Sequence, residues 1–182
     1  LPILINAQEG FFDVESVWPK LEQALRQAIS NLVAMRETEG SNIYGDFIKR
    51  ADLIAEKLAV IEERSPQVVE EYQTRLSDRI NELLEKHNQV IEPERLLQEV
   101  AIFADRTSIT EEIVRLKSHI KQFKLIIDAD QPVGRKLDFL IQEFNREANT
   151  IASKANDYTL AQVVVEIKAE IEKIREQIQN IE

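Results

Sequence analysis

The chain contains no cysteine and little glycine or proline. Its 182 residues include 4 Gly, 5 Pro and 0 Cys. Without cysteine, the chain can form neither a disulfide framework nor a thiolate metal site, and this absence fits a reducing compartment such as the cytosol. Because all-β folds need many tight turns, the scarcity of Gly and Pro argues against that class.

Long apolar runs are also missing. No run reaches the roughly 20 residues needed to cross a membrane. The opening segment, LPILINAQEGFF, lacks the charged start and long apolar centre of a secretion signal, and it has no initiator Met. We therefore expect a cytoplasmic protein without a membrane partner. We also expect this chain to be a piece of a longer protein, starting in an extended segment.

The charge of the chain is unevenly distributed. The net charge is −10, and such an acidic balance normally argues against nucleic acid, whose phosphates favour basic surfaces. Residues 106–154, however, contain nine Lys/Arg and seven Asp/Glu, a net charge of +2. Residues 1–105 have a net charge of −9 and residues 155–182 one of −3. Phosphate can thus approach residues 106–154 most easily.

Apolar residues recur every three or four positions, which predicts helix along most of the chain. We expect a first helix capped by Ser16, a break at Ser65-Pro66, and a turn at 87–92. A short helix follows over 93–104. Ser108 and Glu111 form a capping-box pattern for the next helix. A loop at 128–134 follows that helix, and Asn156-Asp157 breaks the one after it or caps the last.

These helices predict an all-α fold of long antiparallel hairpins or a bundle, with coiled-coil-like seams. The last helix has an apolar residue at both core positions of each heptad, which favours self-association. Its seam consists of Leu160, Val164, Ile167, Ile171, Ile174, Ile178 and Ile181. A boundary near residues 88–105 would divide an acidic helical region from a C-terminal helical region.

Glu112, Arg115 and His119 form the first constellation that could carry chemistry. Their spacings of three and four place them on one helix face. A carboxylate and an imidazole so placed could hold a divalent metal or act as acid and base. A surface ion pair beside a packed histidine would give the same spacing, so both readings remain open.

The second constellation is a helix whose polar face is rich in Arg, Asn and Gln. One stripe contains Arg135, Gln142, Arg146, Asn149 and Ser153, and its neighbour contains Lys136, Glu143, Glu147, Thr150 and Lys154. Such residues could contact phosphates, sugars and bases, with carboxylates available for a metal. A buried polar contact that sets helix register explains the pattern equally well.

Three long blocks resemble the YicC-like (YicC/YloC) endoribonuclease family of bacteria. They are TEEIVRLKSHI from Thr110, GRKLDFLIQEFNREANTIASKAND from Gly134, and EIKAEIEKIREQIQNIE at the end of the chain. The resemblance implies that residues 94–182 form the family's C-terminal domain, and that residues 1–93 continue from a missing N-terminal α+β domain. It also implies a metal-dependent endonuclease acting on single-stranded RNA as a hexamer. Ser108 stands where the family usually has Asp.

On this reading, we expect Mg²⁺ or Mn²⁺ as the cofactor, single-stranded RNA as the substrate and no role for DNA. The residues expected to act in metal binding or acid/base chemistry are Glu111, Glu112, His119, Glu143 and Glu147, with Glu112, His119 and Glu143 as the metal ligands. The residues expected to contact RNA are Arg115, Arg135, Arg146, Lys154, Gln142, Asn145, Asn149 and Thr150.

A non-catalytic role is the main alternative. The heptad seam would suit an oligomerisation scaffold, and long acidic helices would suit a protein-interaction module. In the enzymatic reading, these 182 residues by themselves are expected to cleave RNA weakly or not at all.

Overall fold

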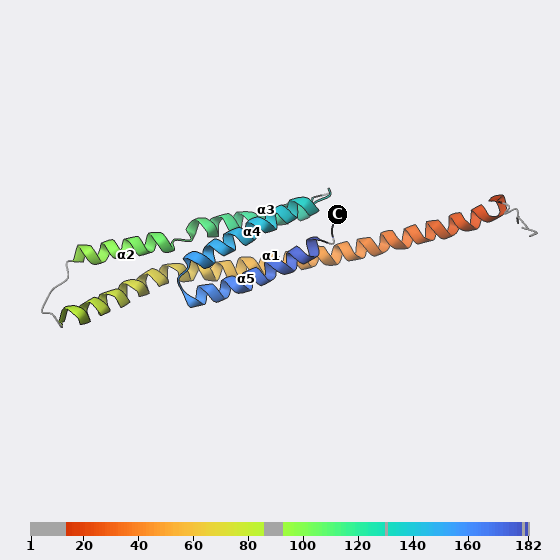
Figure 1. Cartoon of the computed structure of the whole chain (residues 1–182). Helices are drawn as coiled ribbons and strands as arrows, with labels where there is room; N and C mark the ends of the chain where they lie inside the picture. The colour runs from red at the N-terminus through yellow and green to blue at the C-terminus, as the bar shows by residue number, and fades with distance from the viewer. Residues whose placement is uncertain (1–13, 86–92, 130, 180, 182) are drawn as a thin grey trace, which may run out of the picture. The chain divides into compact units, whose positions relative to one another are not determined.

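The computed structural model describes residues 14–85, 93–129, 131–179 and 181. Within these residues the chain forms five helices and no strand: α1 (Val14–Glu85), α2 (Pro93–Thr107), α3 (Thr110–Ile127), α4 (Gly134–Lys154) and α5 (Tyr158–Ile178) (Figure 1). The predicted all-α fold is therefore confirmed. The extended N-terminal segment and the turn at 87–92 lie outside the described residues.

The chain divides into two compact units, residues 1–43 and residues 44–182. In the first unit, the described residues belong to α1 and carry an apolar stripe that is about half exposed. Its members are Trp18, Leu21, Leu25, Ile29 and Leu32, with exposures of 51–55%. The second unit contains the core and the candidate functional residues.

Helix α1 continues without interruption through Ser65-Pro66, so the predicted break is wrong. A proline inside a helix removes one backbone hydrogen bond and costs about 3 kcal/mol. Ile61 and Val68 are buried on either side of it, and Arg64 donates a 2.9 Å hydrogen bond to Glu71, seven residues further along the helix. These contacts offset the cost. Ser16 stands two positions after Val14, the first described residue of α1, and the capping expected of its side chain lies outside what the structure describes.

In the 44–182 unit, α1 runs antiparallel to both α3 and α5. As α1 advances, its ion pairs reach progressively earlier residues of each partner helix. The pairs to α3 are Asp52–Lys124 and Glu62–Lys117. The pairs to the α5 side are Arg50–Glu170, Lys57–Glu166 and Arg64–Asp157. Helix α4 packs against both α3 and α5, which completes a four-helix arrangement (Figure 1).

The core of this bundle contains the heptad seam of α5 and a row of aromatic rings. The seam residues from Leu160 to Ile178 are at most 5% exposed, so this seam packs within the chain. Phe47 of α1 contacts Phe123 of α3 at 5.5 Å between ring centroids, and Phe123 contacts Phe144 of α4 at 5.9 Å. Three helices are thereby joined through buried rings.

The start of α3 differs from the predicted capping box. The N-cap position is Ile109, and no side chain caps the helix there. Ile109 is 1% exposed, so its burial in the core fixes where the helix begins. Glu111, the expected partner of Ser108, instead pairs with Arg115 one turn later.

Asn156 and Asp157 form the sharp turn between α4 and α5. Asn156 has a positive φ of 41°, a conformation that Asn tolerates better than most residues. The carboxylate of Asp157 accepts a hydrogen bond from the backbone N–H of Leu160, which caps α5. The expectation that Asn156-Asp157 breaks or caps a helix is confirmed, and the structure shows that Asp157 caps α5.

We predict that Asp157→Ala lowers the free energy of unfolding by about 1–3 kcal/mol, because it removes a helix cap and the 2.9 Å contact with Arg64. Asp157→Asn keeps a capping oxygen but loses the charge, so we expect a smaller loss. Thermal unfolding of the two variants beside the wild type would measure both. Equal losses would show that capping contributes little.

Candidate functional site

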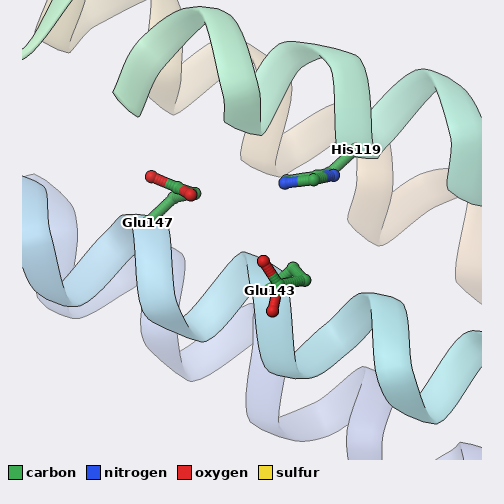
Figure 2. Close-up of side chains that lie close together, drawn as sticks. All are labelled: His119, Glu143 and Glu147. Carbon is green, nitrogen blue, oxygen red and sulfur yellow. The ribbon is translucent and has the colours of Figure 1, made fainter. Parts of the chain in front are cut away.

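His119 of α3 faces two carboxylates of α4. Glu143 and Glu147 are four residues apart, so they lie one above the other on a single face of the helix. One ligand atom from each of the three residues lies within 4.8 Å of the other two. Figure 2 shows both carboxylates projecting from α4 toward the imidazole on α3. We call His119, Glu143 and Glu147 the three-residue cluster.

The carboxylates of the cluster are only loosely paired with arginines. Arg115 lies 3.7 Å from Glu147, and Arg146 lies 3.7 Å from Glu143. Both distances exceed ordinary hydrogen-bond lengths. The Glu147 residue is 3% exposed, and Nδ1 of His119 is buried without a hydrogen-bond partner among the described residues. Buried polar groups without full pairing are costly, so the cluster favours an additional polar or charged occupant.

The chemistry of these donors suits a divalent cation. Two carboxylates and one imidazole supply oxygen and nitrogen ligands and up to two negative charges. The same set offers a base or acid next to carboxylates, as general acid–base chemistry requires. His119 also rests against the core, because its ring centroid lies 6.3 Å from that of Phe144. The aromatic row of the core therefore supports the position of the imidazole.

Glu112 lies on α3 outside the three-residue cluster. Its carboxylate is buried and accepts a 2.7 Å hydrogen bond from Lys154 at the end of α4. Burial raises the pKa of the Glu112 carboxyl, but the hydrogen bond and charge of Lys154, with a contribution from Arg115, outweigh it. The pKa of Glu112 therefore lies below its ordinary value of 4.5. The pair joins the start of α3 to the end of α4.

This depressed pKa predicts an acid-sensitive contact. Glu112 binds a proton less readily in the folded state, so it stabilises the fold above its unfolded pKa, and this stabilisation disappears as pH falls through the lower folded value. We predict that Glu112→Gln lowers the free energy of unfolding by about 1–2 kcal/mol at pH 7, a modest amount because Lys154 is partly exposed. At pH 3 the loss should be much smaller, because the Glu112 carboxyl is then largely protonated in the wild type as well. Urea unfolding at both pH values measures this.

The exposed Glu62–Lys117 pair provides the control for that prediction. Glu62→Gln should leave the unfolding free energy nearly unchanged at both pH values, because exposed ion pairs contribute little. A Glu112→Gln loss that is the same at pH 7 and pH 3 would contradict the assigned ionisation.

A second feature is a polar hollow between α4 and α5. It has a volume of about 520 Å³ and is lined entirely by polar side chains: Gln142, Asn145, Arg146, Asn149, Thr150 and Arg175. Among the described residues, no hydrogen bond engages the amides of Asn145 and Asn149. Arg175 comes from α5 and has only a 3.5 Å contact with Glu172. Free amides and weakly held guanidinium groups are suited to bind phosphate and sugar oxygens.

The polar hollow and the three-residue cluster lie on opposite flanks of α4. Glu147 and Asn149 are two residues apart, which places them about 200° apart around the helix. Arg146 lies between the two flanks, lining the hollow while contacting Glu143 of the cluster. A ligand that reached both sites would have to pass over the solvent-facing side of α4.

Comparison with known proteins identifies a family that includes most of the chain. Residues 61–182 match the family described as "Endoribonuclease YicC-like, C-terminal". The match includes α2 to α5, and with them the three-residue cluster and the polar hollow. The chain belongs to this family. The resemblance seen in the sequence is thereby confirmed.

Two curated members of the YicC-like family match the chain over 181 residues. A protein of Clostridioides difficile named "Probable endoribonuclease YicC" is 50% identical, and one of Haemophilus influenzae with the same name is 35% identical. Each alignment covers 100% of this chain and 61% of the relative. The chain thus spans about 61% of the length of these YicC-like relatives.

The structure brings together only part of the predicted metal set. Of Glu112, His119 and Glu143, the last two lie in the three-residue cluster, and Glu147 completes it. Glu112 is paired with Lys154, so this lysine, expected to contact RNA, is held by a carboxylate. Glu111 is exposed and pairs with Arg115.

The other residues expected to contact RNA fall on two different surfaces. Gln142, Asn145, Arg146, Asn149 and Thr150 line the polar hollow. Arg135 lies instead beside the cluster, in a groove between α3 and α4. The sequence reading missed Arg175, which belongs to an α5 stretch of alternating charges that resembles an ordinary solvated surface. Among the described residues, no helix is long and apolar enough to cross a membrane.

Proposed function

We propose that this chain provides the metal-binding and RNA-contacting helices of a divalent-metal-dependent endoribonuclease, which cleaves phosphodiester bonds of single-stranded RNA in the cytoplasm. The observation that supports this most directly is the three-residue cluster of His119, Glu143 and Glu147, with ligand atoms within 4.8 Å of one another. RNA is proposed as the substrate because both relatives are named as probable endoribonucleases. Membership of the YicC-like family makes RNA more plausible than DNA.

The proposed roles follow from position. His119, Glu143 and Glu147 would hold the cation, either Mn²⁺ or Mg²⁺. A divalent cation at this cluster would supply the positive charge that stabilises negative charge on the oxygens of a phosphodiester. Arg115 lies 3.7 Å from Glu147, and its guanidinium group would be available to a phosphate oxygen if that carboxylate bound a cation.

RNA beyond the cleaved bond would lie in the polar hollow. Arg146 and Arg175 line this hollow and would contact phosphates. Asn145 and Asn149 line it as well, and their amides offer both donors and acceptors to ribose or base. Arg146 reaches the cluster as well, so it can align the strand with the site of cleavage. These contacts would counter the net negative charge of the whole chain locally.

Metal dependence is tested with the intact protein after treatment with a chelator. We expect no cleavage of a single-stranded RNA oligonucleotide until Mn²⁺ or Mg²⁺ is added. Mn²⁺ should act at lower concentration, because an imidazole ligand suits Mn²⁺ better than Mg²⁺. A fully paired RNA of the same sequence serves as the control substrate. Cleavage at an unchanged rate in chelator would contradict the proposal.

An oligomerisation or protein-interaction scaffold remains a second candidate, because of the apolar stripe of residues 18–32 in α1. Half-exposed apolar side chains at helical spacing favour contact with another surface. The family resemblance suggests that this contact joins copies of the chain in a hexamer. Light scattering of wild type and Leu25→Glu, combined with an RNA gel shift, tests it. A stable oligomer that binds no RNA would favour the scaffold over the enzyme.

A further inference from the structure

A groove of about 420 Å³ opens beside the three-residue cluster, between α3 and α4. Two residues of the cluster, His119 and Glu143, line this groove. Beyond them the groove is lined by Gln122 of α3 and by Arg135, Lys136 and Phe139 of α4. A molecule in this groove would therefore touch the cluster at one end.

Phe139 is exposed in a way that its neighbours on α4 are not. It is 64% exposed, whereas Phe144 of the same helix is fully buried. Exposure of a large ring costs hydrophobic free energy, although single exposed apolar residues are common on protein surfaces. Phe139 differs from such isolated residues in its location, because its ring lines a groove that ends at the three-residue cluster.

The residues around Phe139 form a row along α4. Arg135, Phe139, Glu143 and Glu147 follow one another at intervals of four, so each is about 6 Å further along the helix and on nearly the same face. The row begins with a cation, continues with an aromatic ring and ends with the two carboxylates of the cluster. Lys136 lies one residue from Arg135, beside the same groove.

Arg135 and Lys136 differ from the other cations near the cluster. Arg115, Arg146 and Lys154 each contact a carboxylate. In contrast, no hydrogen bond or ion pair within the described part of the chain engages Arg135 or Lys136, and both are exposed. Unpaired cations beside an exposed ring combine the two features with which proteins hold single-stranded nucleic acid: phosphate attraction and base stacking.

We propose that this groove holds the nucleotide adjacent to the cleaved bond, with its base stacked on Phe139 and its phosphate bound by Arg135 and Lys136. The proposal rests on the proposed function for its choice of RNA. Stacking on one ring tolerates any base, so the groove would position the strand without selecting a sequence. It would also keep the neighbouring phosphodiester next to the cluster.

A tryptophan placed in the groove reports base stacking directly. In the intact protein, Trp18→Phe removes one background signal and Phe139→Trp introduces the reporter. The probe is a 2′-O-methyl oligoadenylate of about eight nucleotides, a length within the range of known single-strand sites. The chelator is present throughout, so no cleavage occurs. We expect the oligonucleotide to quench the reporter, and an abasic strand with the same number of phosphates to quench it far less. Equal quenching by both strands would overturn the proposal.

Affinity measurements separate stacking from apolar contact. By fluorescence anisotropy with the same labelled oligoadenylate, Phe139→Leu should bind about tenfold more weakly, whereas Phe139→Tyr should bind like the wild type, because only an aromatic ring stacks. Val165→Ala is the matched control, since Val165 is 66% exposed on α5 away from the groove. If Phe139→Leu binds as tightly as Phe139→Tyr, the ring contacts something other than a base, and the proposal fails.

The proposed phosphate contacts of Arg135 and Lys136 are tested by the salt dependence of binding. Arg135→Ala combined with Lys136→Ala should lower the salt dependence of binding by about one to two phosphate contacts. An unchanged salt slope would contradict their assignment as phosphate contacts.

The outcome for the groove is independent of the outcome for catalysis. Base-dependent quenching without any metal-dependent cleavage would support the groove and refute the proposed function. Metal-dependent cleavage with a Phe139→Leu variant that binds and cleaves like the wild type would do the reverse.

Discussion

Replacing Glu147 by glutamine in the intact protein is expected to lower metal-dependent RNA cleavage by about a hundredfold or more. The substitution keeps the shape of the side chain but removes a negative charge from the three-residue cluster, which is the proposed metal site. Weakening a metal site typically costs 10- to 100-fold in affinity or activity even when an indirect partner is lost, so a direct ligand should cost at least as much. Because Glu147 is nearly fully buried, water cannot easily replace its oxygen.

The measurement is the cleavage rate as a function of Mn²⁺ concentration, together with calorimetry of Mn²⁺ binding. Glu166→Gln provides the matched control, because Glu166 is an exposed carboxylate of the same bundle that pairs with Lys57. It should bind Mn²⁺ and cleave RNA like the wild type. Wild-type metal affinity in Glu147→Gln would show that the cation, if any, binds elsewhere. RNA affinity in chelator should remain unchanged in both variants.

Phe144→Ala is expected to destabilise the 44–182 unit by about 3–5 kcal/mol, the usual cost of removing a buried phenylalanine ring. Phe144 is fully buried and continues the row of rings that joins α1, α3 and α4. It also lies against His119, so any protein that remains folded should bind Mn²⁺ more weakly. Chemical unfolding followed by circular dichroism gives the first effect, and calorimetry gives the second.

Phe139→Ala is the control for stability, since it removes the same atoms from the same helix at an exposed position. Its free energy of unfolding should stay within about 0.5 kcal/mol of the wild type. A loss below 1 kcal/mol in Phe144→Ala would mean that the aromatic row is not a main support of the bundle.

Hydrophobic periodicity alone predicted much of α4. Its apolar residues at spacings of three and four are all buried: Leu137, Leu140, Ile141, Phe144, Ala148 and Ile151. Glu147 stands three residues after Phe144 and four before Ile151, at a heptad position that normally holds an apolar residue. A carboxylate at a core position is unusual, and here it belongs to the three-residue cluster.

The pairing of His119 with α4 was less accessible to sequence reasoning. His119 lies nine residues before the predicted loop at 128–134, and Glu143 lies nine residues after its end, so an antiparallel hairpin places them at the same level. The rotation of each helix about its axis decides whether the side chains meet. That rotation depends on packing against α1 and α5, which the local sequence does not determine.

Errors at helix ends have a common physical origin. Pro66 and Ser108 carry strong local preferences, yet burial of Ile61, Val68 and Ile109 determined where the helices continue or begin. Local propensities amount to about 1–3 kcal/mol, and several buried apolar side chains together exceed them. Asp157 behaved as expected because its local preference and the surrounding packing agree.

The three residues of the cluster all belong to one helical hairpin, formed by α3 and α4. They lie within fewer than 30 positions of one another in the chain. Contacts between residues so close in sequence form quickly, because little loop entropy is lost when the chain closes. During synthesis, this hairpin can therefore fold onto α1 while α5 is still inside the ribosome. We expect the three cluster residues to meet before the bundle is complete, and α5 to pack on the opposite flank of α4 after them.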